Sequence, residues 1–116
     1  MPVVKLTTSQ KLERGDQENL ALELTRIVAE ELNKPASVTQ AVVCDDTVVS
    51  FGGNFIAPSA FIALMSIGGL NKETCTRLSA AFCDLLAKYG ISSQRVYICF
   101  NDKKAEEFGW NSSVFG

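Results

Sequence analysis

The stretch that decides the fold is residues 16–44, DQENLALELTRIVAEELNKPASVTQAVVC, where a helical pattern gives way to a strand. Its apolar residues recur at three- and four-residue steps, which predicts an amphipathic helix of about four turns. Those residues are Leu20, Leu24, Ile27, Val28 and Leu32. Pro35 ends the helix, because a proline disfavours helical geometry in the residue before it. Residues Thr39 to Cys44 favour β-structure and predict the strand that follows.

Further strands and a second helix are predicted before and after this stretch. A short strand is predicted at Val3 to Thr7, and another at Val48 to Phe51. The second half predicts a strand at Ala60 to Ile67, a helix from about Asn71 and a strand at Arg95 to Asn101. The second helix should bury Leu78, Phe82, Leu85 and Leu86, and Gly90 suits its C-terminal cap.

Strand, long helix and strand therefore occur twice at a spacing of about 55 residues, which predicts two βαβ repeats in one sheet. We expect one domain over residues 1–116, with pseudo-repeats at about 1–51 and 58–101 and a C-terminal segment at 102–116. The expected fold class is α/β, more narrowly α+β: a four-stranded sheet with two helices on one face. Residues 61–65 and 96–100 are apolar at successive positions, so both sheet faces should be buried. Two helices cover one face only, which predicts an oligomer.

Charge and hydropathy exclude several classes of partner. The chain has 11 basic and 13 acidic residues and a net charge of -2, without a basic stripe, so we expect no nucleic-acid partner. Its apolar runs are too short for a membrane span. Residues 1–15 lack the apolar region of a signal peptide. We expect a cytoplasmic protein, which could be secreted only by a route without a signal peptide.

The cysteine spacing and the absence of histidine limit the metal sites and the acid–base catalysts that the chain could form. Cys44, Cys75, Cys83 and Cys99 show no C-x-x-C spacing, so we expect four free thiols, no metal and no cofactor. Without histidine, an acid–base catalyst must be another group. If Met1 is removed, Pro2 becomes a secondary amine, and burial or a nearby cation could lower its pKa enough to make it a base. Many chains begin Met-Pro without such chemistry, so this dipeptide alone leaves the question open.

Six short motifs occur in order and together are specific: Met1-Pro2, Asn33-Lys34-Pro35, Ser50-Phe51-Gly52-Gly53, Ser66-Ile67-Gly68-Gly69, Arg95-Val96-Tyr97-Ile98 and Gly109-Trp110-Asn111-Ser112-Ser113-Val114-Phe115. Over its whole length the chain resembles the macrophage migration inhibitory factor family of the tautomerase superfamily. The Gly-Trp-Asn ending favours that branch over D-dopachrome tautomerase.

The resemblance implies a homotrimer with active sites between neighbouring subunits. It implies keto–enol tautomerisation of small aromatic α-keto acids such as phenylpyruvate, with dopachrome derivatives as further substrates. It also implies a cytokine-like role with a cell-surface receptor of the invariant-chain type. The alternative is such a receptor-binding ligand with a weak or vestigial pocket.

The resemblance also assigns roles to single residues. Pro2 matches the catalytic base, Lys34 the cation for the substrate carboxylate, and Ile67, beside Ser66, the backbone that meets the substrate. Tyr97 matches a pocket residue that reaches in from the adjacent subunit. The aromatic rim is formed by Phe108, Trp110 and Phe115. Each has an ordinary alternative: a lysine before a proline is often a solvated helix-end charge, and a strand tyrosine or a lone tryptophan is often only packing.

Three positions depart from the family pattern. Cys99 stands where the family usually has an asparagine, which weakens or removes one hydrogen bond to the substrate. Val38 stands where many members have an aromatic residue at the pocket mouth, which predicts a wider entrance. Residues Pro58 to Phe61 replace the C-x-x-C of some members, so we expect no thiol oxidoreductase activity.

Overall fold

The computed structural model describes all residues, 1–116. Its elements run β1 (Pro2–Thr8), α1 (Arg14–Leu32), β2 (Gln40–Cys44), β3 (Ala60–Ser66), α2 (Lys72–Ala87), β4 (Val96–Asp102), β5 (Gly109–Trp110) and β6 (Ser113–Val114). Short 3-10 turns lie at Ala36–Val38, Ser93–Arg95 and Ala105–Glu107. Both predicted helices and four of the five predicted strands are present within one or two residues of the expected bounds.

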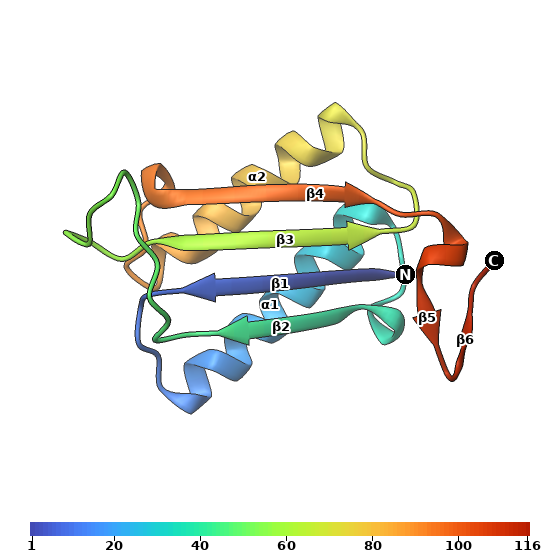
Figure 1. Cartoon of the computed structure of the whole chain (residues 1–116), viewed down its shortest axis with the longest axis horizontal. Helices are drawn as coiled ribbons and strands as arrows, with labels where there is room; N and C mark the ends of the chain where they lie inside the picture. The colour runs from blue at the N-terminus through green and yellow to red at the C-terminus, as the bar shows by residue number, and fades with distance from the viewer.

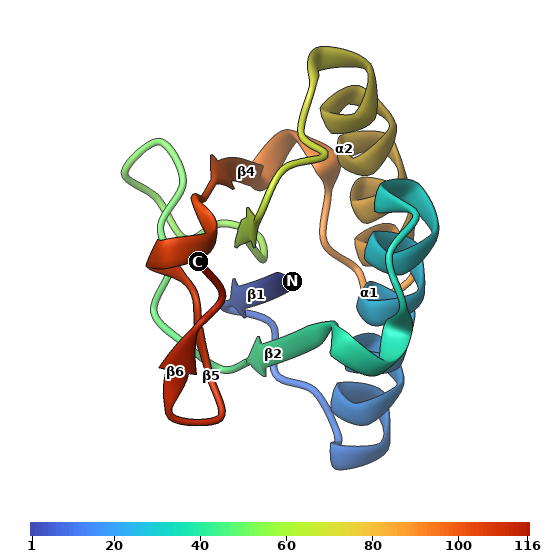
Figure 2. The same cartoon turned by 90° about the vertical axis from the view of Figure 1, so that its right-hand side faces the viewer.

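The four long strands form one mixed sheet in the order β2-β1-β3-β4. β1 is parallel to β2 and β3 is parallel to β4, while β1 and β3 are antiparallel. Each parallel pair is joined through a helix, and both helices lie on one face of the sheet (Figures 1 and 2). This confirms the predicted α+β fold of two βαβ units.

The core lies between the helices and the sheet. Burial alternates along β1 and β3, so that every second side chain faces the helices and is buried. Phe82 of α2 is the largest side chain that is fully buried. The core is completed by Val4, Leu6, Leu20, Leu24, Ile27, Val28, Leu32, Ala60, Ile62, Leu64, Leu78, Leu85, Leu86 and Ile91.

The other face of the sheet carries apolar side chains that no helix covers. Tyr97 is 68% exposed and Phe61 is 40% exposed on this face. Figure 2 shows that only the connection between β2 and β3 and the C-terminal hairpin β5–β6 lie on this side. The single chain therefore does not provide the second layer that its strand pattern calls for.

The prediction of a strand at Val48 to Phe51 is wrong. These residues lie in the connection between β2 and β3, and their only pairing is an isolated bridge between Phe51 and Asn54. Gly52 and Gly53 have φ angles of +61° and +75°, so the chain reverses directly after Phe51. Two positive φ angles in succession make a tight turn. The β-branched residues before this turn predicted a strand, but no partner strand of the same chain lies beside them.

The two helices end in the same way. Asn33 (φ +52°) and Gly90 (φ +81°) take the left-handed conformation that closes a helix. After α1 the Lys34 N–H donates to the Ala29 carbonyl at 3.0 Å, and after α2 the Ile91 N–H donates to the Leu86 carbonyl at 3.2 Å. Lys34 and Ile91 thus occupy equivalent places in the two repeats, with the Lys34 position fixed by its own backbone.

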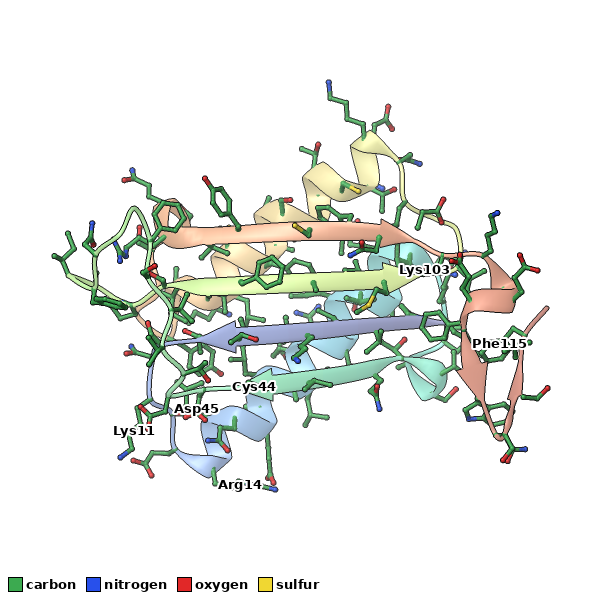
Figure 3. The ribbon with its side chains drawn as sticks, viewed as in Figure 1. Lys11, Arg14, Cys44, Asp45, Lys103 and Phe115 are labelled. Atoms are coloured by element: carbon green, nitrogen blue, oxygen red, sulfur yellow. The ribbon has the colours of Figure 1, made fainter.

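The two ends of the sheet differ in chemistry (Figure 3). At the end where β1 finishes, Asp45 accepts hydrogen bonds from the Leu12 N–H at 2.7 Å and from Gln17 Nε2 at 3.0 Å. The Leu12 hydrogen bond, with that from Gln17, holds the pKa of Asp45 below its usual range. The other end, where β1 starts, carries the C-terminal hairpin with Phe115.

All four cysteines are free. Burial raises the pKa of both thiols on α2, Cys75 and Cys83, which keeps them in the unreactive protonated form.

We expect Phe82→Ala to lower the free energy of unfolding by about 3–5 kcal/mol, because it removes a fully buried ring and leaves a cavity. Phe82→Leu should cost about 1 kcal/mol, since most of the volume is kept. Leu22 is 68% exposed, so Leu22→Ala is the matched control and should leave stability nearly unchanged. Urea unfolding at fixed protein concentration measures all three. Equal losses for Phe82→Ala and Leu22→Ala would contradict the core described here.

Candidate active site

A cavity of about 390 Å³ opens where the chain begins. Three segments that are distant in sequence meet there: the start of β1, the entry to β2 and the C-terminal hairpin. The lining residues are Met1, Pro2, Val3, Ser37, Val38, Thr39, Gln40, Phe108, Gly109, Trp110 and Phe115. The structure thus brings Pro2, Val38 and the three predicted rim aromatics together around one cavity.

The C-terminal hairpin gives this cavity an aromatic wall. The rings of Trp110 and Phe115 are stacked, with centroids 6.2 Å apart and an interplanar angle of 7°. Phe108 lies against Phe115 at 6.3 Å, and the Phe115 N–H donates to the Phe108 carbonyl at 3.1 Å. A flat apolar surface of this kind binds an aromatic ring by stacking.

The opposite wall is polar, and the sequence analysis did not identify it. It consists of Ser37, Thr39 and Gln40 around the exposed Val38. The Thr39 hydroxyl donates to the Pro35 carbonyl at 3.0 Å, which fixes this part of the wall. Short polar residues at a strand entry are common, so nothing in their pattern indicated a cavity.

The N-terminal amine lies beside Lys34. Burial lowers the pKa of the Met1 amine, and the Lys34 charge and a hydrogen bond with its ammonium lower it further. The Lys34 Nζ also donates to the Ile67 carbonyl at 2.6 Å. Pro2, which follows the amine, is buried and pairs with Ser66 across the sheet. A partly dehydrated amine with a cation next to it is suited to act as a base.

The segment Ser66 to Gly69 forms the turn that presents the Ile67 carbonyl. The Ser66 hydroxyl donates to the Gly68 carbonyl at 2.9 Å, and the Gly68 N–H donates to Asp102 Oδ1 at 3.0 Å. Gly68 and Gly69 have φ angles of +73° and +84°. The sequence analysis missed Asp102; its position at the end of a strand that runs beside β3 was the available signal.

Tyr97 and Cys99 are not at this cavity within one chain. Tyr97 pairs with Phe61 of β3, five positions from the Ser66 that pairs with Pro2, which corresponds to about 16 Å along the strand. The Tyr97 ring packs against Phe51, with centroids 5.0 Å apart. Cys99 pairs with Ala63 and is exposed on the open face of the sheet.

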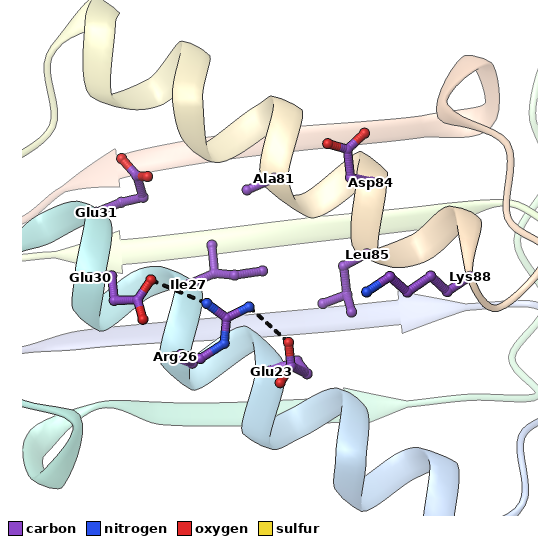
Figure 4. Close-up of a pocket in the computed structure, with 9 residues that line it drawn as sticks. All are labelled: Glu23, Arg26, Ile27, Glu30, Glu31, Ala81, Asp84, Leu85 and Lys88. Atoms are coloured by element: carbon purple, nitrogen blue, oxygen red, sulfur yellow. Dashed lines mark hydrogen bonds and ion pairs between the residues drawn. The ribbon is translucent and has the colours of Figure 1, made fainter.

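A second cavity, of about 270 Å³, lies between the outer surfaces of α1 and α2 (Figure 4). Three of its charged side chains form ion pairs: Arg26 contacts Glu23 at 2.8 Å and Glu30 at 3.1 Å. These side chains are exposed, and the groove contains no cysteine, serine or tyrosine. No three acidic or cysteine side chains converge as metal ligands would. Neither helix combines the length and apolarity that crossing a bilayer requires.

Comparison with known proteins agrees with this arrangement. The family model for macrophage migration inhibitory factor matches residues 1–116. A macrophage migration inhibitory factor homolog of Trichinella spiralis is 34% identical, over 99% of this chain and 100% of its own length. The macrophage migration inhibitory factor of Meriones unguiculatus is 36% identical, over 84% of this chain and 85% of its own.

Solved structures give the same result. The macrophage migration inhibitory factor-like protein of Entamoeba histolytica superposes with a TM-score of 0.92 at 31% identity, covering 98% of both chains. The homologue from Prochlorococcus marinus also gives 0.92, at 30% identity, with 98% of this chain and 99% of its own covered. The family model matches the whole length, the relatives and structures match 84–99% of it, and the chain belongs to the macrophage migration inhibitory factor family.

Proposed function

We propose that this protein is an isomerase that interconverts the keto and enol forms of small aromatic α-keto acids, with the Pro2 amine as the base. The observation that carries the proposal is the placement of the chain start. The Met1 amine, one residue before Pro2, lies beside Lys34 with a lowered pKa, and the cavity that Met1 and Pro2 line has an aromatic wall. Membership of the macrophage migration inhibitory factor family also supports the proposal.

The proposed reaction needs only a proton transfer. After removal of Met1, the neutral Pro2 nitrogen takes a proton from the carbon next to the keto group. The electrons of that C–H bond form the C=C bond, and the carbonyl π electrons move to oxygen. The protonated Pro2 amine then returns its proton to the oxygen, directly or through water, so the product is the enol, the base is regenerated and no redox partner or cofactor is required. Burial and the Lys34 charge lower the pKa of the Met1 amine, and we expect both effects to act on the adjacent Pro2 amine once Met1 is removed, which favours the neutral form with a free lone pair.

The other residues bind the substrate. Lys34 holds the substrate carboxylate and faces the oxygen on which negative charge develops, where a fixed cation stabilises the transition state. Ser66 and Ile67 supply the backbone next to it, and Phe108, Trp110 and Phe115 hold the ring. Val38 leaves the cavity mouth open, which favours a broad range of aromatic substituents. Cys99 offers a weaker hydrogen bond than an amide would.

The complete site requires a trimer in this proposal. Tyr97 and Cys99 lie on the uncovered face, about 16 Å and about 10 Å along the sheet from Pro2, so only another copy of the chain brings them to its cavity. The exposed Phe61 and Tyr97 on that face support assembly, since such a surface is costly in water.

A second candidate function is a secreted ligand for a cell-surface receptor of the invariant-chain type. The relatives' names describe an effect on macrophage migration, which favours a role outside the cell. Apolar side chains at Val48, Phe55 and Ile56 are 87%, 67% and 85% exposed in the connection between β2 and β3, on the opposite end of the sheet from the cavity. Receptor binding that survives Pro2→Gly would separate this role from catalysis.

We expect a homotrimer in solution. Sedimentation equilibrium at micromolar concentration should give three times the chain mass. Phe61→Lys should lower that mass, because it places a charge on the apolar face, whereas Leu22→Lys on α1 should not. A wild-type protein that stays monomeric would contradict both the assembly and the shared site.

Activity should require the free Pro2 amine. Protein that retains Met1 should show no tautomerase turnover of hydroxyphenylpyruvate, because an acylated proline nitrogen is an amide without a basic lone pair. Pro2→Gly should lose most or all of the activity and keep the assembly. The N-terminus is verified by mass, and enol formation is followed by ultraviolet absorbance. Full activity with Met1 present would rule out Pro2 as the base.

Lys34→Ala should raise KM and move the rising limb of the pH–rate profile to higher pH. The Lys34 charge lowers the pKa of the Met1 amine, and we expect it to lower that of the free Pro2 amine in the same way; its loss then raises the pKa, so the neutral amine appears only at higher pH. Lys34→Arg keeps the charge and is the matched control; it should retain the low-pH limb. An unchanged limb in Lys34→Ala would show that the cation does not act on the base.

A further inference from the structure

One peptide group, between Ile67 and Gly68, is held by opposite charges at its two ends. Its carbonyl accepts a hydrogen bond from Lys34 Nζ at 2.6 Å. Its N–H donates to Asp102 Oδ1 at 3.0 Å. The C=O and N–H of a trans peptide point in opposite directions in one plane. Asp102 and Lys34 therefore act on the same dipole from opposite sides.

These two hydrogen bonds strengthen each other. A carboxylate that accepts from the N–H increases the negative charge on the carbonyl oxygen of the same group, which makes this oxygen a better acceptor for an ammonium. Cooperative strengthening is about 10–30% per bond. Bonds to ionised partners are also shorter and stronger than neutral ones, and the Lys34 distance of 2.6 Å agrees with this.

Asp102 is a rigid anchor, whereas the turn is not rigid by itself. Asp102 is the last residue of β4 and pairs with Ser66, and the next N–H, of Lys103, donates to the Ser66 carbonyl at 2.8 Å. The turn contains two successive glycines with positive φ, a sequence that allows many backbone conformations. The carboxylate thus links a flexible turn to the end of the sheet.

We propose that Asp102 is a positioning residue that holds the Lys34 ammonium, through the Ile67–Gly68 peptide, beside the N-terminal amine and the substrate carboxylate. This rests on the proposed function in so far as Lys34 and the amine perform the chemistry. Asp102 itself touches no substrate in this arrangement. Its effect is to fix where the positive charge stands.

The test compares Asp102→Ala, Asp102→Asn and Asp84→Ala in trimeric protein with Met1 removed. Asparagine keeps an acceptor oxygen for the Gly68 N–H without the charge, and alanine keeps neither. Asp84 is a carboxylate on α2 in the groove between the helices (Figure 4) and serves as the remote control. The measurements are KM and kcat for hydroxyphenylpyruvate across pH, and the pKa of the Pro2 amine by ¹⁵N NMR.

Asp102→Ala should raise KM about tenfold, since misplacing a binding group by about an ångström is costly. The amine pKa should rise, because Lys34 is released from its place, and the rising limb of kcat/KM should move to higher pH with it. Asp102→Asn should stay within about twofold of wild type, and Asp84→Ala should match wild type.

The sign of the amine shift distinguishes positioning from simple charge. Loss of a nearby negative charge alone would lower the amine pKa, and by the same amount in the alanine and asparagine variants. That result would overturn the proposal, as would a lower thermal stability of Asp102→Ala without any change in the amine pKa. Every variant keeps the other charged groups next to Asp102, so these groups do not contribute to a difference in the amine pKa. They are Lys103 and Lys104, which follow Asp102, and Glu107, which accepts a hydrogen bond from the Lys104 N–H at 2.9 Å.

A measurement on wild type covers the case in which Asp102→Ala does not fold. The amide proton of Gly68 should exchange slowly with solvent because it donates to Asp102 Oδ1, and a Gly68 amide that exchanges as fast as an unprotected one would overturn the proposal. A failure of the proposed function can be told apart from a failure of this inference. If wild type with free Pro2 shows no turnover, the proposed function fails. The amine pKa of the variants still reports whether Asp102 positions Lys34.

Discussion

The antiparallel pairing of β1 with β3 is the constraint on which the rest of the structure depends. It places Pro2 opposite Ser66 and Thr8 opposite Ala60, and a shift by one residue would turn every buried side chain of β1 to the open face. The parallel partner β2 requires α1 to run back along β1, so α1 ends where β1 begins. The parallel partner β4 ends beside Ser66. The amine, Lys34, the Ile67 carbonyl and Asp102 therefore meet at one end of the sheet as a result of topology alone.

The pseudo-repeat explains why only one such site exists in each chain. Lys34 follows α1 and the equivalent Ile91 follows α2, with the same helix-ending hydrogen bond. Ile91 is almost fully buried in the core, whereas the Lys34 ammonium reaches the chain start. β3, the counterpart of β1, begins inside the chain with the amide of Ala60 and offers no amine. In the first repeat this position places Lys34 beside the N-terminal amine, and in the second it places Ile91 in the core.

Much of this could be predicted from the sequence because the elements are strongly periodic. The spacing of Leu20, Leu24 and Ile27 specified α1, and the internal repeat specified the pairing of two βαβ units. The strand at Val48 was not predictable, because strand formation depends on a partner and β-propensity alone does not supply one. Asp102 and the polar wall at Gln40 were missed for a related reason. Their roles arise from contacts between segments far apart in the chain, and the only signal in the sequence was the position of Asp102 at the end of a predicted strand.

The surroundings of the N-terminal amine include the hairpin β5–β6, a part of the fold that is not joined to the main sheet. Burial is the largest cause of the lowered amine pKa, and the hairpin β5–β6 closes this end of the cavity. That hairpin pairs only with itself and is not joined to the main sheet. An isolated two-stranded hairpin is marginal in water, so its position must depend on the stacked rings of Trp110 and Phe115 and on the contact with Phe108. The rings that would hold a substrate line the same cavity as Met1. In the proposed function, we therefore expect substrate binding and the basicity of the amine to depend on the same hairpin.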